Sequence, residues 1–337
     1  MKPSVYIGID LGGTSIKIGL VDQLGNILYT LEKPTPVKAG YHQVLAVFSQ
    51  MAEKLFQNNP YEWKDIIGVG AGVPAFLDQQ KGIVIEAVNL NWNNMPLRDD
   101  LERMWKVPIM VDNDANAAAL GEMWNGAGKG ASHLICLTLG TGIGGGVIIN
   151  GDIYHGANGS AGEVGHMTVK HQGGRSCNCG RKGCLETEAS ATAIVLDALE
   201  QVKGISSGPL KEEYDKTGTI TAKSVVQLAQ QGDFISIEII TKVGRILGST
   251  LAQMCYLLNP EVIVIGGGVA LAGKVLFDPL IQAFNTAILP RVAENTSIIP
   301  AKLGNQAGLT GAAWLIHRKY IGSREAKTVD STSYGIN

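Results

Sequence analysis

Two spacings of apolar residues alternate along the first half of the chain, one typical of strands and the other of helices. Apolar and small residues fill 5–10 and 15–21 and predict two strands joined by the turn Gly12-Gly13-Thr14. Apolar residues at helical spacing over 42–57 predict an amphipathic helix that packs on a sheet. Further strands are predicted at 66–72, 82–88 and 107–111, and further helices at 96–105 and 117–124.

The second half begins with an apolar run at 134–139, which predicts a buried strand. The next residues, 140–146, are so rich in glycine that we interpret them as a turn, with a returning strand at 147–149. We expect helices at 189–202, 221–231, 234–258 and 309–320, a strand at 262–265, a polar loop at 204–218 and a disordered tail at 323–337.

The same pattern of strand, Gly/Thr turn and strand therefore occurs twice, at 5–21 and at 134–149. Such a turn lets backbone N–H groups approach a phosphate closely, because glycine has no Cβ. The repeat predicts a duplicated domain whose two phosphate loops could grip one polyphosphate from both sides. For either loop taken alone, a plain glycine-rich hairpin is the alternative interpretation.

Composition and charge narrow the class of protein. The chain has 337 residues, 45% hydrophobic and 17% charged, as expected of a globular protein in solution. A net charge of −2 without a Lys/Arg cluster argues against nucleic-acid binding. No apolar run approaches the roughly 20 residues of a membrane span, and Asp10 interrupts the only stretch that resembles a signal peptide. We therefore expect a cytoplasmic protein that binds neither nucleic acid nor membrane.

The stretch Asp112-Asn113-Asp114-Ala115-Asn116 stands between a predicted strand and a predicted helix. In α/β proteins, ligands bind where strands end and helices begin. Asp114 could accept the proton of an attacking hydroxyl, and Asn113 could orient the neighbouring groups. Helix capping is the alternative, but one residue suffices for a cap, so four polar residues favour catalysis.

Asp10 lies where the first strand meets its turn. A carboxylate there could hold Mg²⁺, directly or through water. The alternative is a turn residue that bonds to its own backbone. The nearby Thr14 and Lys17, together with the second glycine-rich loop, favour the metal role.

Three of the five cysteines, Cys177, Cys179 and Cys184, lie within eight residues, and His166 precedes them. One imidazole and three thiolates complete a tetrahedral Zn²⁺ shell with no open position, which is typical of a structural zinc. Three reduced thiols, or one disulfide and a spare thiol, are the alternatives.

Farther along, the glycines at 266–268 could cradle an adenosine or simply form a tight turn.

Four stretches together resemble the ROK family of bacterial sugar kinases and repressors: 10–17, 113–116, 140–166 and 177–186. The resemblance runs from about Tyr6 to Trp314, and the last two stretches are its most specific part. It implies an α/β actin-like ATPase (ribonuclease H-like) fold, made of duplicated domains with a cleft between them. A small domain would span 1–118, joined by a C-terminal helix at about 305–322, and a larger domain with the zinc motif would span 119–304.

The resemblance also implies roles for individual residues. Asp114 would be the general base that takes the proton from the sugar 6-hydroxyl. The sugar would be bound by Asn113, Asp114, Glu163, His166 and Glu186. The phosphate and Mg²⁺ site would be lined by Asp10, Gly12, Gly13, Thr14, Lys17, Thr141 and Gly142, and the adenosine by Gly267 and Gly268. The zinc ligands would be His166, Cys177, Cys179 and Cys184.

Within this family the chain is most similar to enzymes that transfer phosphate from ATP to the 6-hydroxyl of glucose, giving glucose 6-phosphate and ADP. The alternatives are a kinase for N-acetylmannosamine, allose, mannose or fructose, and a sugar-sensing repressor. Family repressors carry a helix-turn-helix before the first phosphate loop, and a first strand near residue 5 leaves no room for one, which favours the enzyme. Polyphosphate in place of ATP, and a homodimer or a homotetramer, stay open.

Overall fold

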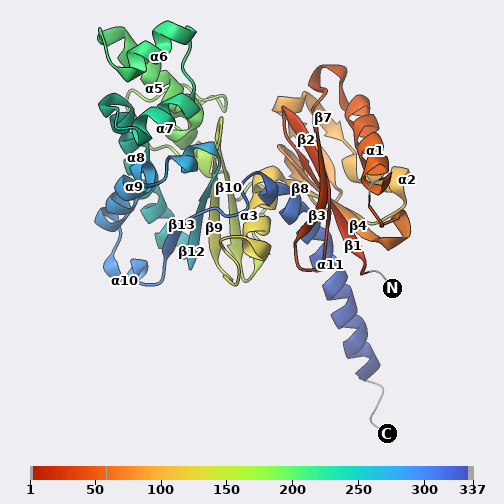
Figure 1. Cartoon of the computed structure of the whole chain (residues 1–337). Coiled ribbons are helices and arrows are strands. Elements are labelled where there is room, and N and C mark those ends of the chain that lie inside the picture. Colours follow the sequence, from red (N-terminus) through yellow and green to blue (C-terminus); the bar gives the residue numbers. More distant parts are fainter. Residues whose placement is uncertain (1–2, 58, 333–337) are drawn as a thin grey trace. The chain divides into compact units, whose positions relative to one another are not determined.

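The structure is a computed structural model that describes residues 3–57 and 59–332. The chain divides into two compact units (Figure 1). Unit 1 comprises residues 1–130, 152–161 and 305–337, and unit 2 comprises residues 131–151 and 162–304. Within the described residues, no helix is both long and apolar enough to cross a membrane.

Unit 1 is built on a five-stranded sheet of order β3-β2-β1-β4-β8. Strand β1 is antiparallel to β2 and parallel to β4, and β4 is parallel to β8. The strands are β1 (Val5–Leu11), β2 (Ser15–Val21), β3 (Ile27–Pro34), β4 (Ile66–Val73) and β8 (Ile109–Asn113). A smaller antiparallel sheet joins β5 (Phe76–Asp78), β6 (Ile83–Ala87) and β7 (Trp92–Met95).

Alternate side chains of β1 pack in different apolar clusters. Ile7 and Ile9 share a buried cluster with Phe48 of α1 (Tyr41–Gln57), while Tyr6 packs with Leu309 of α11 (Ala307–Thr332). Glycines in β1 and β4 make room for α11, because a Cβ at Gly8 or Gly70 would overlap its backbone. The remaining helices of unit 1 are α2 (Leu97–Trp105) and α3 (Asp114–Asn125).

Unit 2 repeats this arrangement in strands β10, β9, β12 and β13. Strand β9 is antiparallel to β10 and parallel to β12, and β12 is parallel to β13, which matches the order β2-β1-β4-β8 in unit 1. The predicted duplication is therefore confirmed in the connectivity of the two sheets. The strands are β9 (Leu134–Leu139), β10 (Ile143–Ile149), β12 (Val262–Gly266) and β13 (Ser297–Pro300); β11 (Asp152–Ile153) follows the turn after β10.

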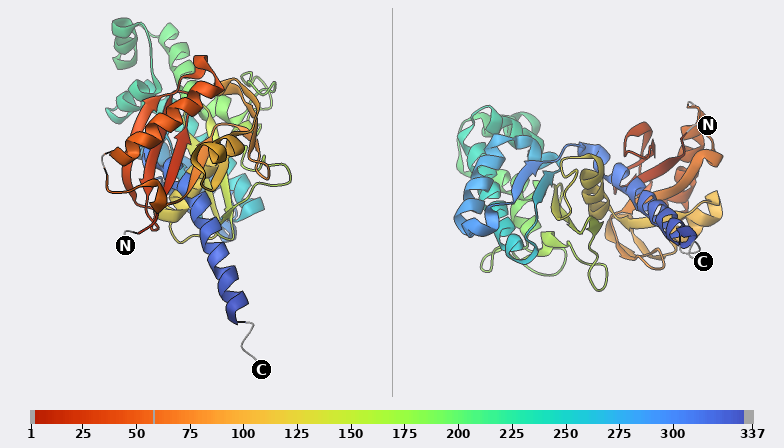
Figure 2. Two further views of the ribbon diagram at one scale, coloured as in Figure 1. Left: turned by 90° about the vertical axis from the view of Figure 1, so that its right-hand side faces the viewer. Right: turned by 90° about the horizontal axis from the view of Figure 1, so that it is seen from below.

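The helices of unit 2 form one apolar core with its sheet. The long helix α8 (Phe234–Leu258) lies against α9 (Lys274–Ala287), and Gly244 and Gly248 allow the two backbones to approach closely (Figure 2). The other helices are α4 (Leu185–Ala189), α5 (Ala191–Gly204), α6 (Pro209–Thr217), α7 (Ala222–Gln230) and α10 (Pro290–Ala293).

Two local predictions for unit 2 were wrong. The glycines at 144–146 lie inside β10 and pair with β9. At Gly145 there is no room for a side chain, because a Cβ would lie 2.6 Å from the Gly162 carbonyl oxygen. The expected polar loop at 204–218 contains α6, which begins with Pro209 at its first turn and ends at Gly218 in the left-handed conformation. Strands β3 and β13 were not predicted.

The predicted domain limits also need correction. The boundary falls after residue 130 rather than 118, residues 152–161 return to unit 1, and the two units are comparable in length. Helix α3 belongs to unit 1 because it packs on α11 through Gly121 and Gly311, where a Cβ would overlap the facing backbone.

The C-terminal tail differs from its prediction as well. Helix α11 continues to Thr332, so 323–332 are helical rather than disordered. The stretch 324–327 consists of residue types with high helix propensity, which lets a helix already begun in the core continue. Residues 333–337 lie outside the described part of the chain.

Candidate active site and metal centre

The first glycine-rich loop joins β1 to β2 in unit 1. The backbone N–H of Gly12 donates to the Ser15 carbonyl at 2.8 Å, and the Thr35 hydroxyl donates to the Gly12 carbonyl at 2.7 Å. Thr14, at the tip, is exposed. The loop is therefore held from β2 and from the end of β3, with Thr14 left accessible to a ligand.

Asp10 and Lys17 face each other across β1 and β2 at the base of this loop. Lys17 Nζ lies 3.7 Å from Asp10 Oδ2. Burial nevertheless raises the pKa of Asp10, against the lowering effect of Lys17. A Cβ at Gly308 would lie 2.8 Å from the Asp10 carboxyl carbon, so the start of α11 borders the same carboxylate. A carboxylate disfavoured in this way is suited to bind a cation.

The predicted catalytic stretch spans the end of β8 and the start of α3 in unit 1. Asn113 caps α3, because its Oδ1 accepts from the backbone N–H groups of Ala115 at 2.8 Å and Asn116 at 3.2 Å. Asp114 is the first residue of the helix, and its Oδ1 accepts from the Ala115 N–H at 2.9 Å. Asn113 is thus the capping residue of α3. Capping, the alternative interpretation, therefore does not require a carboxylate at position 114.

The second glycine-rich loop, Gly140-Thr141-Gly142, joins β9 to β10 in unit 2. The Gly140 carbonyl accepts from the Ala191 N–H at 2.9 Å, and the Thr141 carbonyl accepts from the Thr192 hydroxyl at 2.7 Å. The start of α5 therefore fixes this loop. A Cβ at Gly142 would lie 2.6 Å from Glu186 Oε2, so a predicted phosphate-loop residue and a predicted sugar ligand are neighbours.

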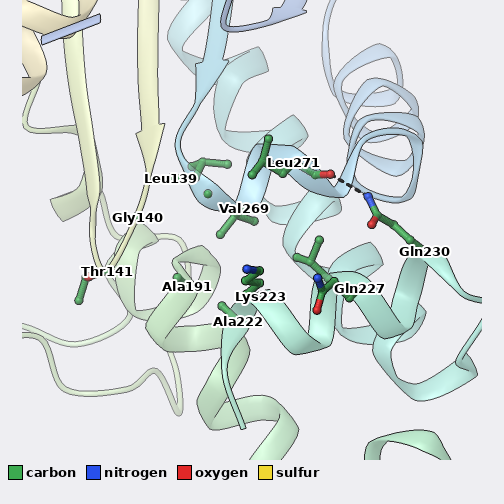
Figure 3. Close-up of a pocket in the computed structure, with 12 residues that line it drawn as sticks. Leu139, Gly140, Thr141, Ala191, Ala222, Lys223, Gln227, Gln230, Val269 and Leu271 are labelled. Atoms are coloured by element: carbon green, nitrogen blue, oxygen red, sulfur yellow. Dashed lines mark hydrogen bonds between the residues drawn. The ribbon is translucent and has the colours of Figure 1, made fainter. Parts of the chain in front are cut away.

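A cavity of about 410 Å³ opens beside this loop within unit 2 (Figure 3). Gly140 and Thr141 border it from the loop, Lys223 and Gln227 from α7, and Gly268 from the turn after β12. The amide of Gln230 donates to the Leu271 carbonyl at 2.8 Å and ties α7 to that turn. The lining, mainly apolar with one lysine, is suited to a flat apolar ring that carries a negatively charged group.

Gly267 and Gly268 meet different demands in this turn. Gly267 has φ of 85°, and a Cβ there would overlap the backbone of Leu139. Gly268 lines the cavity, and a Cβ there would meet nothing within 4 Å. The first glycine is thus needed by the fold, whereas the second keeps the cavity wall open.

The four predicted metal ligands come together in unit 2. The ligand atoms of His166, Cys177, Cys179 and Cys184 all lie within 4.8 Å of one another. Cys177 Sγ is 3.6 Å from His166 Nδ1, and Cys179 Sγ is 3.6 Å from Cys184 Sγ. A tetrahedral zinc, with Zn–S of about 2.3 Å and Zn–N of about 2.1 Å, places such atoms about 3.6–3.8 Å apart. The donor set and its spacing therefore fit zinc.

Cys177, Cys179 and Cys184 form no disulfide in the described residues, so the predicted alternative of a disulfide is wrong. Their pKa values move in opposite directions. The Arg181 backbone N–H, which bonds to Cys179, lowers the pKa of that thiol to about 6. Burial raises the pKa values of Cys177 and Cys184. Without a cation, three thiolates would not share this space, and a bound metal ion would stabilise all three.

Three predicted sugar ligands cluster beside the cysteines. His166 Nε2 lies 3.9 Å from Glu163 Oε2, and His166 Nδ1 lies 3.6 Å from Glu186 Oε1. The Nδ1 atom faces the thiols, which leaves Nε2 available to another ligand. Burial raises the pKa of Glu163, with a further contribution from Glu186. Asn113 and Asp114 belong to unit 1, so their predicted action together with these residues stays a prediction.

Two kinds of site residue were missed from the sequence. Lys223 and Gln227 line the cavity from α7, and their helical spacing signals only a helix surface. His155 lies 2.7 Å from Asp112, the residue before the proposed catalytic pair. No short motif joins residues so far apart in the sequence, and only the folded unit brings them together.

Comparison with known proteins gives this arrangement a family. Residues 6–319 match the ROK family. The chain is 44% identical to a glucokinase of Halalkalibacterium halodurans over 319 residues, covering 95% of this chain and 97% of that protein. It is 32% identical to a xylose repressor of Caldicellulosiruptor bescii, covering 92% of this chain and 77% of the repressor.

Among solved structures, a ROK family glucokinase from Streptomyces griseus, in complex with glucose and AMPPNP, superposes with a TM-score of 0.77. The two sequences are 33% identical, over 93% of this chain and 99% of that one. The structural relatives include ROK sugar kinases with the actin-like ATPase fold, as the sequence predicted, and also a ROK family transcriptional regulator, which superposes with a TM-score of 0.80 at 25% identity over 93% of this chain and 78% of that one. On the match along nearly its whole length, the chain belongs to the ROK family.

Proposed function

We propose that this protein is an ATP-dependent glucokinase, which transfers the γ-phosphoryl group of ATP to the 6-hydroxyl of glucose. The observation that carries the proposal is the 44% identity to a glucokinase over 97% of that protein's length. The site geometry supports it, because the described residues provide a nucleoside-sized cavity, two glycine-rich loops and a carboxylate at a strand end.

The nucleotide would bind in unit 2. Its adenosine would enter the cavity between α7 and the turn that contains Gly268, and its phosphates would lie along Gly140-Thr141-Gly142. Backbone N–H groups of such a loop neutralise phosphate oxygens without a bulky side chain in the way. Lys223 would add a positive charge at the cavity wall.

The sugar would be bound by hydrogen bonds from carboxylate, amide and imidazole groups: Asn113, Glu163, His166 and Glu186. Asp114 would accept the proton of the 6-hydroxyl as the oxygen O6 forms its bond to the γ-phosphorus and the bond to ADP breaks. The proton then resides on Asp114, and ADP carries away the negative charge. Asn113 already caps α3, which fixes the backbone of Asp114.

Zinc would be held by His166, Cys177, Cys179 and Cys184 and would have a structural role, because four protein ligands close its shell. With Nδ1 bound to the metal, the imidazole of His166 would be fixed with Nε2 as the atom offered to a sugar hydroxyl. Mg²⁺ would be held near Asp10 and would neutralise charge on the transferred phosphate. The backbone of Gly12, Gly13 and Thr14 would contact the same phosphates.

The proposal is tested with pure protein in an assay of sugar phosphate formation, which measures transfer from either donor. Glucose, mannose, fructose, allose and N-acetylmannosamine are compared as acceptors, and ATP and polyphosphate as donors. We expect the highest kcat/KM with glucose and ATP. A higher value with another hexose would overturn the substrate assignment, and a failure of all five sugars to be phosphorylated with either donor would overturn the kinase.

A further inference from the structure

His155 makes a short contact with the strand end that carries the proposed catalytic base. Its Nε2 lies 2.7 Å from Asp112 Oδ2, and both residues belong to unit 1. The Asp112 side chain is only 3% exposed, whereas that of His155 is 31% exposed. A carboxylate so deeply buried needs partners for both oxygens, and His155 provides one of them.

The other oxygen of Asp112 holds the start of α3. Asp112 Oδ1 accepts from the backbone N–H of Asn113 at 2.7 Å and from the side-chain amide of Asn116 at 2.9 Å. Asn113 and Asn116 flank Asp114 in the first turn of the helix. A shift of the Asp112 carboxylate would therefore move the residues on both sides of Asp114.

His155 lies in the segment 152–161, which belongs to unit 1 although the residues before and after it in the sequence belong to unit 2. The segment begins with β11, which pairs with β10, and within unit 1 Asp152 pairs with Arg318 and His155 with Asp112. The segment continues directly into Gly162 and Glu163. The His155–Asp112 pair thus joins this segment to the end of β8 within unit 1.

We propose that His155 is a positioning residue for phosphoryl transfer: through Asp112 it sets the orientation of Asp114 toward the sugar hydroxyl. This inference rests on the proposed kinase function. His155 itself touches neither sugar nor nucleotide in this proposal. Its contribution is to keep the buried carboxylate in one place, because a misplaced base slows the reaction even when substrate still binds.

The electrostatics of the pair agree with this assignment. The hydrogen bond to Asp112 raises the pKa of His155, against the lowering effect of burial. Whether the imidazole is charged or neutral, an Nε2–H can donate to Asp112, so the bond persists across the neutral pH range. Loss of the donor would leave an oxygen of a buried carboxylate without its partner, which is costly.

The first test compares three variants by steady-state kinetics. His155→Phe removes the donor, whereas His155→Gln can place an amide N–H near the position of Nε2. Tyr154→Phe is the control, because Tyr154 is the exposed neighbour on the same segment. We expect His155→Phe to lower kcat by roughly 10–100-fold with KM for glucose changed far less, and His155→Gln to recover most of that loss.

Three results would overturn the positioning role: an unchanged kcat in His155→Phe, an equal loss in both variants at position 155, or a change confined to KM. Melting curves for all variants ensure that rates are compared at a temperature where each is folded. If His155→Phe does not fold, the kcat of His155→Gln decides, because it keeps the donor and should stay within about threefold of wild type.

The second test does not depend on activity. The pKa of His155 is measured by NMR titration of its ring protons in the full chain and in Asp112→Asn. We expect a value above the ordinary one for histidine in the wild type and a lower value in the variant. The same pKa in both would overturn the pairing. If the wild type phosphorylates no hexose, the proposed function fails, while this titration still decides the His155–Asp112 contact.

Discussion

The two units share one sheet topology but place different chemistry on it. In unit 1, the strand ends carry carboxylates: Asp10 on β1, and Asp112 on β8 before Asp114. In unit 2, the corresponding strands are uncharged where they reach the site, with Thr138 on β9 paired to Gly144 where Asp10 pairs with Lys17.

Unit 2 instead gains its chemistry from what is inserted between β10 and β12. That insertion supplies the metal cluster and α7, which walls the cavity. The duplicated sheet thus provides two similar loops, and in the proposed mechanism catalysis and binding are divided between the two units. Unit 1 would act on the hydroxyl and the cation, and unit 2 would hold the nucleoside and the metal-anchored histidine.

The largest effect is expected from Asp114→Asn. This variant keeps the shape of the side chain and an oxygen that can accept from Ala115, but it removes the proton acceptor. A positioned general base contributes about 10²–10⁴-fold to rate. We expect kcat to fall by that factor while glucose affinity, measured by calorimetry, changes little. Because Asn caps a helix as well as Asp does, a kcat near the wild-type value would identify Asp114 as a structural residue.

The metal cluster of unit 2 should couple stability to sugar binding. Elemental analysis should find about one zinc per chain. In Cys179→Ser, His166 would lose a fixed position, so we expect KM for glucose to rise by roughly 10–100-fold and Tm to fall. Cys255→Ser is the control, since Cys255 lies in the core away from the cluster. A metal-free preparation with full activity and an unchanged Tm would refute the zinc assignment.

The cavity wall of unit 2 offers a test of nucleotide binding alone. A leucine at Gly268 would meet no neighbour within 4 Å of its Cβ, and its side chain would narrow the cavity. We expect Gly268→Leu to raise KM for ATP about tenfold or more, because the leucine would displace the nucleoside from part of its apolar contact with the cavity wall. Glucose binding should be unchanged. Gly204→Leu, also in open space but away from the cavity, should leave both values unchanged. Equal KM values for ATP in the two variants would place the nucleoside elsewhere.

The smallest effect is expected for Asp10, on stability and its pH dependence. Burial raises the pKa of Asp10, so the folded state disfavours the carboxylate relative to the unfolded chain. This penalty is present above the folded pKa and disappears as pH falls through it. Asp10→Asn should therefore raise Tm at neutral pH and leave it nearly unchanged at acid pH. A lower Tm at neutral pH would mean that the pairing with Lys17 outweighs burial.

The sequence predicts local features of this protein better than distant ones. The helix at 234–258 and the strand at 134–139 have the predicted limits. Both follow from the pattern of apolar residues within the segment itself, which does not depend on distant contacts. The His/Cys cluster is likewise confirmed as a group, since its spacing and glycine turns bring the ligands together over a short stretch.

What the sequence misses depends on contacts between distant segments. The glycines 144–146 form a strand by pairing with β9, and Gly145 has no room for a side chain because the chain at 162–164 packs against it. The return of residues 152–161 to unit 1, and with it the contact of His155 with Asp112, follows from packing that no local pattern encodes. The cavity residues on α7 carry no motif, so only the folded unit identifies them.

Phosphoryl transfer to the 6-hydroxyl of glucose can be observed in the reaction products by NMR. The protein is incubated with glucose and ATP, and ³¹P spectra are recorded with time, with 6-deoxyglucose as the control acceptor. We expect equal amounts of ADP and glucose 6-phosphate, and no phosphorylated product from 6-deoxyglucose. A sugar phosphate formed from 6-deoxyglucose, or ADP accompanied only by inorganic phosphate, would contradict it.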